Sequence, residues 1–306
     1  AMSTSQQRQL AHEAAERYER VLVPLILGPA AKTLVEGANF EQNDTVLDVG
    51  CGTGAAARFA AEKLGAAGRV IGVYVNAGML EVARSLPRAE GAAIEWREGS
   101  AYDLPLENES VDVVLCAQTL QFLTDRPAAL AEMYRVLKPG GRLFLSVWCD
   151  LRENPYFHAI VESISKYIGR ETAVGLEAAF GLADPQEVRT LIVQAGLSGI
   201  EVAVGQVDLN LPEPTEFVPI HVSATRMSTG LNCIKLRQKR NGSAAGPKIS
   251  LCHMHRVIPV ARAHRATAHV DFLVAVVHPL AIGLEIQVGV SMVHGLGRGD
   301  SGHQPD

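Results

Sequence analysis

Short apolar runs alternate with helical segments over the first half of the chain. Between these runs, apolar residues recur three and four positions apart, which indicates amphipathic helices. Strands and helices that alternate in this way build a parallel sheet through right-handed crossovers. The pattern therefore predicts an α/β fold with a doubly wound, mostly parallel sheet. The expected strands cover residues 45–47, 69–75, 94–96, 111–116 and 142–147.

Further helices are expected on both sides of this sheet. Residues 5–36 show helical spacing, with breaks or bends at Pro24 and at the pair Gly28-Pro29. Residues 154–181 are also expected to be helical. Another helix begins after Asp184, and Glu187 completes a capping-box-like pair with it.

The alternating pattern ends with a strand expected over residues 199–204. Beyond residue 230 the composition changes: seven of the ten histidines lie there, and the formal charge is +5, against −10 before that point. This composition resembles translation in a shifted reading frame, a hypothesis that resequencing the encoding DNA tests. Residues 230–306 are expected to be an irregular C-terminal tail, in which 251–260 or 270–277 could still form strands.

Overall composition narrows the class of protein. The chain is 47% hydrophobic and 20% charged, as in a soluble globular protein. No apolar run reaches the roughly 20 residues of a membrane-spanning helix, so no integral membrane segment is expected. Five scattered cysteines favour buried thiols in a reduced, cytoplasmic protein over a disulfide framework. The acidic body disfavours nucleic acid as a partner.

The sequence DVGCGTG at residues 48–54 directly follows the first apolar run. Glycine lets the backbone approach a ligand where a Cβ would clash, and the helix that follows supplies unpaired N–H donors. Asp48 can accept a hydrogen bond from a cationic or hydroxylated ligand group. The turn also fits a loose dinucleotide-binding pattern, so by itself it leaves two cofactors open.

Later motifs favour one of the two cofactors. The second strand leads into residues 76–80, the third into 98–105, the fourth precedes 120–122, and a helix ends in 135–141 with the sequence RVLKPGG. With these motifs in this order and spacing, the chain resembles the class I S-adenosylmethionine (SAM)-dependent methyltransferases over roughly residues 15–225. Within them it is similar to the small-molecule group that includes the ubiquinone/menaquinone-biosynthesis type.

The resemblance implies SAM as cofactor, S-adenosylhomocysteine (SAH) as product, and a Rossmann-like fold with a helical lid. It also implies a division of the chain. Residues 1–40 would form an N-terminal helical lid segment, and 41–229 the SAM-dependent methyltransferase domain. Within that domain, 153–182 would be an insert that covers the substrate, and 230–306 would remain the tail.

The resemblance further implies cofactor contacts along the carboxyl edge of the sheet. Asp48 and the turn would face the amino-acid end of SAM, and Met79 would lie against the adenine. A purely structural role is the alternative for both residues. The expected cofactor-binding residues are Asp48, Gly50, Cys51, Gly52, Gly54, Tyr74, Val75, Met79, Ser100, Ala101, Cys116 and Gln121.

Two of these positions depart from the family pattern. Tyr74 stands where relatives carry an acidic residue that grips both ribose hydroxyls, and Ser100 stands where relatives more often have Asp. A lost hydrogen bond to a charged group costs roughly 1.5–3 kcal/mol, less whatever the phenol restores. Tyr74 therefore predicts weaker SAM binding.

No fixed catalytic motif is expected, because the sulfonium of SAM is already activated and the protein mainly binds and orients its substrates. If the acceptor needs a general base, Tyr156, His158 and His221 are candidates, although an ordinary packing or surface role is favoured for each. Cys252-His253-Met254-His255 lacks the second ligand pair of a zinc site, so no metal is expected.

The sequence thus predicts methyl transfer from SAM to a small-molecule acceptor. A degenerate SAM-fold protein with weak or no activity is the main alternative, because of Tyr74, Ser100 and the unusual tail. An NAD-dependent enzyme is less favoured, since it too requires the missing acid. A hydrolase lacks the Gly-x-Ser-x-Gly nucleophile turn.

Overall fold

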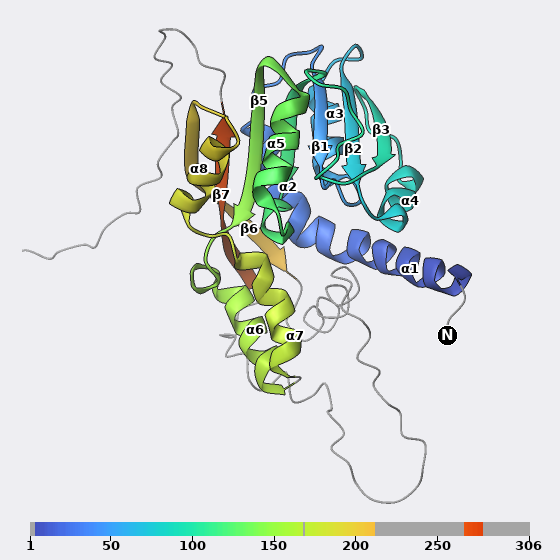
Figure 1. Cartoon of the computed structure of the whole chain (residues 1–306). Helices are drawn as coiled ribbons and strands as arrows, with labels where there is room; N and C mark the ends of the chain where they lie inside the picture. Colours follow the sequence, from blue (N-terminus) through green and yellow to red (C-terminus); the bar gives the residue numbers. More distant parts are fainter. Residues whose placement is uncertain (1–3, 168, 212–265, 278–306) are drawn as a thin grey trace, which may run out of the picture.

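The computed structural model describes residues 4–167, 169–211 and 266–277. These residues form a seven-stranded sheet with the order β3-β2-β1-β4-β5-β7-β6 (Figure 1). Neighbouring strands are parallel except for β7, which is antiparallel to both β5 and β6. The mostly parallel α/β sheet predicted from the sequence is confirmed. The strands are β1 (Thr45–Val49), β2 (Arg69–Tyr74), β3 (Ala93–Glu98), β4 (Val111–Ala117), β5 (Leu137–Trp148), β6 (Ile200–Leu211) and β7 (Ala266–Val277).

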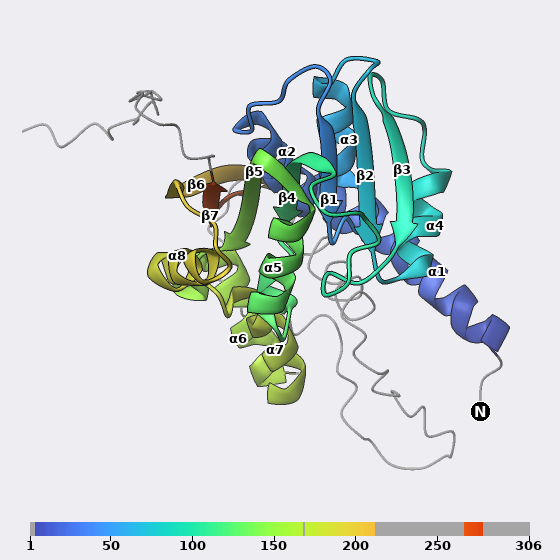
Figure 2. The same cartoon turned by 45° about the horizontal axis from the view of Figure 1, so that its top comes forward.

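Helices cover both faces of the sheet, as Figure 2 shows. One face packs against α2 and α3, with Leu34 and Ala57 buried against the strands. The other face packs against α5 and α8, through residues such as Met133 and Ile192. The helical segments are α1 (Thr4–Leu22), η1 (Val23–Leu27), α2 (Gly28–Glu36), α3 (Ala55–Lys63), α4 (Ala77–Ser85), η2 (Leu120–Phe122), α5 (Arg126–Val136), η3 (Leu151–Glu153), α6 (Pro155–Tyr167), α7 (Arg170–Glu177), η4 (Ala178–Phe180) and α8 (Pro185–Gln194).

Side-chain caps fix where several helices begin. The carboxylates of Asp125 and Asp184 accept from backbone N–H groups at the starts of α5 and α8, and Pro follows each as the first or second helical residue. The expected capping-box role of Glu187 is wrong, because its carboxylate instead accepts from Arg126 on α5 at 3.0 Å. Glu187 therefore links α8 to α5.

The N-terminal segment does not form a single lid. At the expected break, the chain passes through the π-helical turn η1 and continues directly into α2. Leu34 and Val35 of α2 are 1% exposed and belong to the core against the sheet. Only α1 lies across the carboxyl ends of β1–β3, where it also packs against α4 (Figure 1). Of the segment 1–40 expected as a lid, only α1 therefore lies at this edge, whereas α2 belongs to the core.

Strand β7 comes from the segment that was expected to be an irregular tail. It pairs with β5 over Leu143–Trp148 and with β6 along its whole length, so it lies inside the sheet. The expected domain end at residue 229 is too early for this sheet. Residues 270–277, one of the two stretches named as a candidate strand, lie in β7, whereas 251–260 lie outside the described residues.

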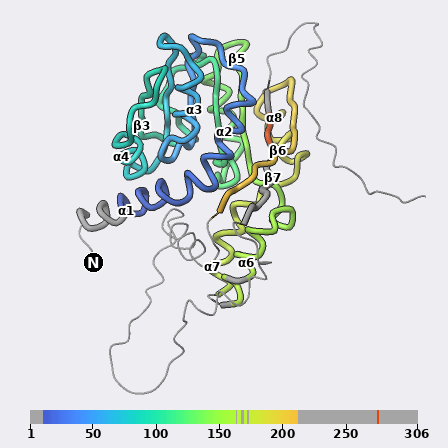
Figure 3. Tube along the Cα trace, turned by 180° about the vertical axis from the view of Figure 1, so that it is seen from behind, coloured from blue at the N-terminus to red at the C-terminus, as the bar shows by residue number. Residues whose placement is uncertain are grey.

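A second helical cover lies at the same end of the sheet as α1. The expected insert forms α6, α7 and η4, which Figure 3 shows below β6 and β7. Phe157 of α6 anchors this cover, with its ring centroid 5.8 Å from that of Trp148 and 5.3 Å from that of Phe180. Leu209 and Leu211 of β6 complete the cluster. The two covers therefore border the carboxyl edge of the sheet.

None of the helices in the described part of the chain combines the length and the apolar character that a bilayer crossing requires.

Candidate functional site

The glycine turn after β1 uses left-handed backbone conformations and is held by hydrogen bonds to β2. Gly50, Gly52 and Gly54 all have positive φ, at 76°, 56° and 93°. The N–H groups of Gly50 and Cys51 both donate to the carbonyl of Val73 on β2, at 2.9 and 3.1 Å. Only glycine adopts such a series of left-handed conformations at low cost. The turn therefore has the shape that the sequence predicted.

The three glycines of the turn differ in how much room their surroundings leave for a Cβ atom. A Cβ on Gly50 would lie 2.2 Å from Thr119, and one on Gly54 would lie 2.2 Å from the Trp96 ring. A Cβ on Gly52 would meet only the Tyr18 side chain, with the hydroxyl at 3.6 Å. Gly50 and Gly54 are thus closed by packing, whereas Gly52, although buried, has room for a Cβ next to the hydroxyl of Tyr18.

Asp48 lies at the base of this turn and is 1% exposed. Its Oδ2 accepts from the N–H of Ala57, in the first turn of α3, at 3.0 Å. Burial raises its pKa to about 7, although the bond from Ala57 lowers it. The Asp48 side chain therefore has a structural role, because it accepts a hydrogen bond from the first turn of α3. It is also a carboxyl group that a nearby cation would convert to its ionised form. The Oγ1 atom of Thr53 is buried in the same turn without a partner in the described residues.

A packed tyrosine, Tyr74, lies at the end of β2, where β1 has its glycine turn. The phenol of Tyr74 is half-buried and packs with Tyr18, Ala15, Met79 and Val82 between α1 and α4. Burial and the neighbouring thiol of Cys51 raise the pKa of Tyr74, so the phenol stays protonated. Met79 is 4% exposed, which makes it a core residue of this cluster. Val75, the next residue after Tyr74, is 68% exposed.

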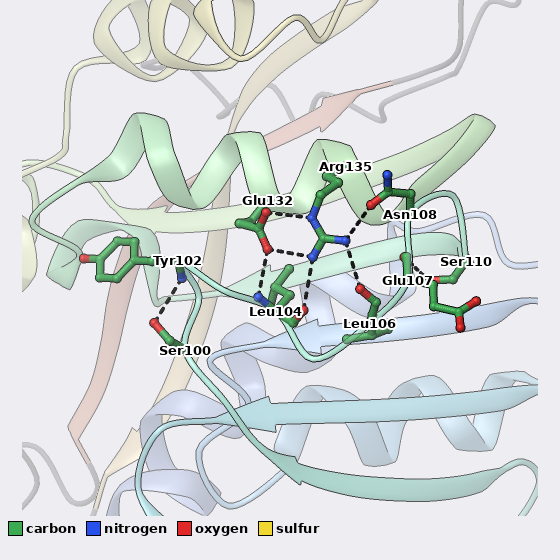
Figure 4. Close-up of polar contacts among 9 residues, drawn as sticks. All are labelled: Ser100, Tyr102, Leu104, Leu106, Glu107, Asn108, Ser110, Glu132 and Arg135. Atoms are coloured by element: carbon green, nitrogen blue, oxygen red, sulfur yellow. Dashed lines mark hydrogen bonds and ion pairs between the residues drawn. The ribbon is translucent and has the colours of Figure 1, made fainter.

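The loop after β3 is held by an ion pair on α5, as Figure 4 shows. Arg135 donates to both carboxylate oxygens of Glu132 at 2.7 Å, and also to the carbonyls of Leu104 and Leu106. Glu132 in turn accepts from the N–H of Leu104 at 2.8 Å. Because the backbone of residue 104 is bound on both sides, the pair fixes the loop in place.

This ion pair, the Glu132–Arg135 clamp, supports the residues expected near the adenine. Ser100 and Asp103 pair as an isolated bridge, and the N–H of Tyr102 donates to the Ser100 hydroxyl at 3.1 Å. Ala101 packs against the core between them. The weaker acceptor that replaces Asp in relatives is therefore already engaged within its own turn.

The end of β4 brings three polar side chains to the glycine turn. The hydroxyl of Thr119 can donate to either of two carbonyls, that of Gly50 at 3.2 Å or that of Ala117 at 3.1 Å. Gln118 and Gln121 flank it and are 9% and 4% exposed. Cys116, by contrast, is fully buried in the core, where burial raises its pKa to about 12. Cys116 therefore lies beneath the edge, without open surface for a ligand.

Of the candidate bases, Tyr156 lies in an environment that disfavours proton abstraction. Tyr156 packs edge-on against Phe157, with ring centroids 5.2 Å apart, and burial raises its pKa. A base must be deprotonated, so this shift disfavours that role near neutral pH. His158 lies on α6 with its Nδ1 3.9 Å from Glu162, and its side chain is 42% exposed. His221 and the residues 252–255 lie outside the described part of the chain.

The structure adds residues that the sequence motifs did not identify. Tyr18 approaches Gly52 from α1, and Trp96 and Thr119 close the turn on its two sides. None of these belongs to a motif, because each reaches the turn from another element of the fold. For Tyr18, the sequence predicted only that it lies in the helical segment 5–36.

Comparison with known proteins identifies the class. Residues 47–145 match a family model described as a methyltransferase domain. A 2-phytyl-1,4-beta-naphthoquinone methyltransferase of Arabidopsis thaliana is 30% identical over 172 residues, or 55% of this chain and 64% of the relative. A demethylmenaquinone methyltransferase of Oceanobacillus iheyensis is 30% identical over 186 residues, or 56% and 76%.

The fold agrees with a solved structure. A SAM-dependent methyltransferase of Thermotoga maritima, described as a possible histamine N-methyltransferase, has a TM-score of 0.51 and 20% identity. The match covers 89% of this chain and 99% of that chain. The chain belongs to the class I SAM-dependent methyltransferases. Within that class, its relatives include the quinone-biosynthesis methyltransferases, and the cofactor of this group is SAM.

This result confirms the resemblance seen in the sequence and decides between the two cofactors that the glycine turn alone left open. The chain spans less than two thirds of the Arabidopsis relative's length.

Proposed function

We propose that this protein transfers the methyl group of SAM to a small-molecule acceptor. The observation that carries the proposal is the turn after β1, where a buried Asp48 lies beneath three glycines of which only Gly52 has room for a Cβ. In the reaction, an electron pair of the acceptor forms the bond to the methyl carbon while the sulfur–carbon electrons return to sulfur. SAH leaves as product, and the acceptor loses a proton if it carried one.

The glycine turn suits the amino-acid end of SAM. The Tyr18 hydroxyl and the unpartnered Thr53 Oγ1 supply donors beside Gly52, where a carboxylate needs them. Asp48 supplies a negative charge that a cationic ligand favours. We therefore assign Asp48, Gly50, Cys51, Gly52 and Gly54 to that end.

The remaining expected residues would contact other parts of the cofactor. Tyr74 and Val75 would then border the ribose. Met79, Ser100 and Ala101 would border the adenine, and Gln121 the acceptor side. Cys116 is left out because it is buried in the core.

Two features support a small molecule as the acceptor. The relatives are named for quinone-type acceptors, and the acidic body before residue 230 repels phosphate backbones. Buried thiols at Cys51 and Cys116 favour a reducing compartment, so we place the protein in the cytoplasm.

A non-catalytic SAM-fold protein is the alternative that Tyr74 favours. Titration of SAH followed by a tritiated-methyl assay on small-molecule extracts separates the two. Binding together with label transfer supports the enzyme, and binding without transfer to any extract supports the alternative. No binding of SAH or SAM contradicts both.

A further inference from the structure

Two glutamine side chains at the end of β4 form an incomplete hydrogen-bonded pair. The Nε2 of Gln121 donates to the Oε1 of Gln118 at 3.1 Å. This leaves the Nε2 of Gln118 and the Oε1 of Gln121 buried without a partner among the described residues. The pair therefore presents one open donor group and one open acceptor.

This pattern does not depend on how the two amides are oriented. An amide carries one carbonyl and one NH₂ group, and the two are hard to distinguish by shape alone. If both side chains were turned over, the bond between them would simply reverse its direction. One donor and one acceptor would still be left open on the same pair.

The pair lies between the glycine turn and the helical cover. Thr119, which separates the two glutamines in sequence, is bonded to the carbonyl of Gly50. On the other side, η2, which carries Gln121, packs against η4 of the cover. The backbone N–H of Gln118 is held by Ser146 on β5 at 2.9 Å, and the Ser146 hydroxyl is itself buried without a partner. The pair therefore lies between the expected methionine end of SAM and the helical cover.

Energetics argue that these open atoms have a purpose. A buried, unpaired polar group costs about 1–3 kcal/mol, and native structures keep few of them. Gln118 also has a φ of +51°, a left-handed conformation that is unusual for a side chain of this kind. Two apolar residues of similar size would avoid the cost of the unpaired atoms. The retained amides therefore point to a ligand that completes their bonds.

We propose that Gln118 and Gln121 bind the methyl acceptor. We further propose that this acceptor is a neutral molecule with a hydroxyl next to a second hydroxyl or a carbonyl. The open acceptor of the pair takes the hydroxyl proton, and the open donor reaches the neighbouring oxygen. A charged group would be buried against two neutral amides without a counter-ion, which is costly. The guanidinium of Arg126 is bonded to Glu187 and to the carbonyl of Gln121, and its Nε is buried without a partner in the described residues. This inference rests on the proposed function, because the acceptor lies beside SAM.

Catechol and phenol test the proposal as a matched pair of probes, since phenol lacks the second oxygen. The affinity of each for the wild-type protein saturated with SAH is measured by calorimetry. A site built to bond a polar group discriminates strongly against an analogue that lacks it. We expect catechol to bind at least about tenfold more tightly than phenol, since one hydrogen bond is worth roughly that factor. In Gln118→Met and in Gln121→Met this preference should fall to about twofold or less.

The controls separate this proposal from its competitors. Both variants should retain the wild-type affinity for SAH within about twofold, and Gln194→Met, exposed at the end of α8, should change neither value. A parallel loss of SAH affinity would assign the pair to the cofactor instead. An unchanged catechol preference, or no catechol binding by the wild-type SAH complex, would overturn the proposal. Absence of SAH binding to the wild type would instead contradict the proposed function itself.

Discussion

The ends of β1 and β2 lie side by side at the same edge of the sheet but are built from different chemistry. The β1 end combines a buried carboxyl at Asp48 with a backbone that has room for a Cβ at Gly52, so it offers polar groups to a ligand. The β2 end is filled by the phenol of Tyr74, which packs with Tyr18 and Met79 beneath α1. The β1 end therefore presents polar groups, whereas the β2 end is closed by packed side chains. We therefore expect substitutions at the β1 end to weaken SAM binding more than substitutions at the β2 end.

The largest expected effect is at Gly52. In Gly52→Ala the new Cβ occupies the space next to the hydroxyl of Tyr18, so we expect SAH affinity to fall at least about 100-fold. The left-handed φ of the residue adds a stability loss of only about 1–2 kcal/mol. Calorimetry and chemical denaturation measure the two quantities separately.

Gly140→Ala is the matched control for this variant. Its φ is +81° and nothing lies within 4 Å of the added Cβ, so it carries the same backbone strain in open space. It should lose similar stability and keep its SAH affinity. Equal SAH affinity in both variants would remove Gly52 from the site.

A smaller effect, about tenfold on SAM affinity at pH 8, is expected for Asp48→Asn. Because burial raises the pKa of Asp48 to about 7, wild-type SAM affinity should increase as pH rises through 7, and the variant should lose this dependence.

The stability of the ligand-free protein should change with pH in the opposite direction to SAM affinity. A raised carboxyl pKa stabilises the folded state below the unfolded pKa of about 4, and this contribution is lost as pH rises through about 7. Denaturation at pH 5.5 and 8 should therefore show a fall in the wild type that is absent in Asp48→Asn. The asparagine can still accept from Ala57. An identical pH profile in both proteins would refute the assignment of this titration to Asp48.

An intermediate effect is expected at the clamp on α5. Glu132→Gln weakens the bonds to Arg135 and Leu104, so the loop that carries Ser100 and Ala101 loses its fixed position. We expect about fivefold weaker SAH binding and a stability loss of about 1–2 kcal/mol. Glu107→Gln, at an exposed position of the same loop, is the control. If stability falls while SAH affinity is unchanged, the clamp has no part in binding.

The smallest effect, and the only gain, is expected at the β2 end. Tyr74→Asp restores an acceptor for the ribose hydroxyls but removes packing against Met79, so SAM binding should tighten only about threefold. Tyr74→Phe keeps the packing and should leave SAM affinity near the wild-type value. Calorimetric titration of both variants checks this, and an unchanged affinity in Tyr74→Asp would contradict it.

The sequence predicted the elements whose signals are local. The strands from β1 to β5 and the turn at 48–54 follow from apolar runs and glycine spacing. Strand β7 was missed as part of the domain because it pairs with strands far away in sequence, and its surroundings carry no regular pattern. Glu187 was misassigned for a similar reason, since its partner Arg126 is 61 positions away. The position of Tyr18 over Gly52 and the open atoms of Gln118 and Gln121 exist only once the chain is folded.

The central claim is that the β1 end binds the amino-acid part of SAM. Calorimetric titration of SAH into the wild-type protein at pH 7, in two buffers of different ionisation enthalpy, tests it most directly. We predict saturable one-to-one binding that releases a fraction of a proton as Asp48 ionises. Asp48→Asn should still bind, more weakly and without that release. Absence of saturable binding, or proton release that is the same in Asp48→Asn, would contradict the account.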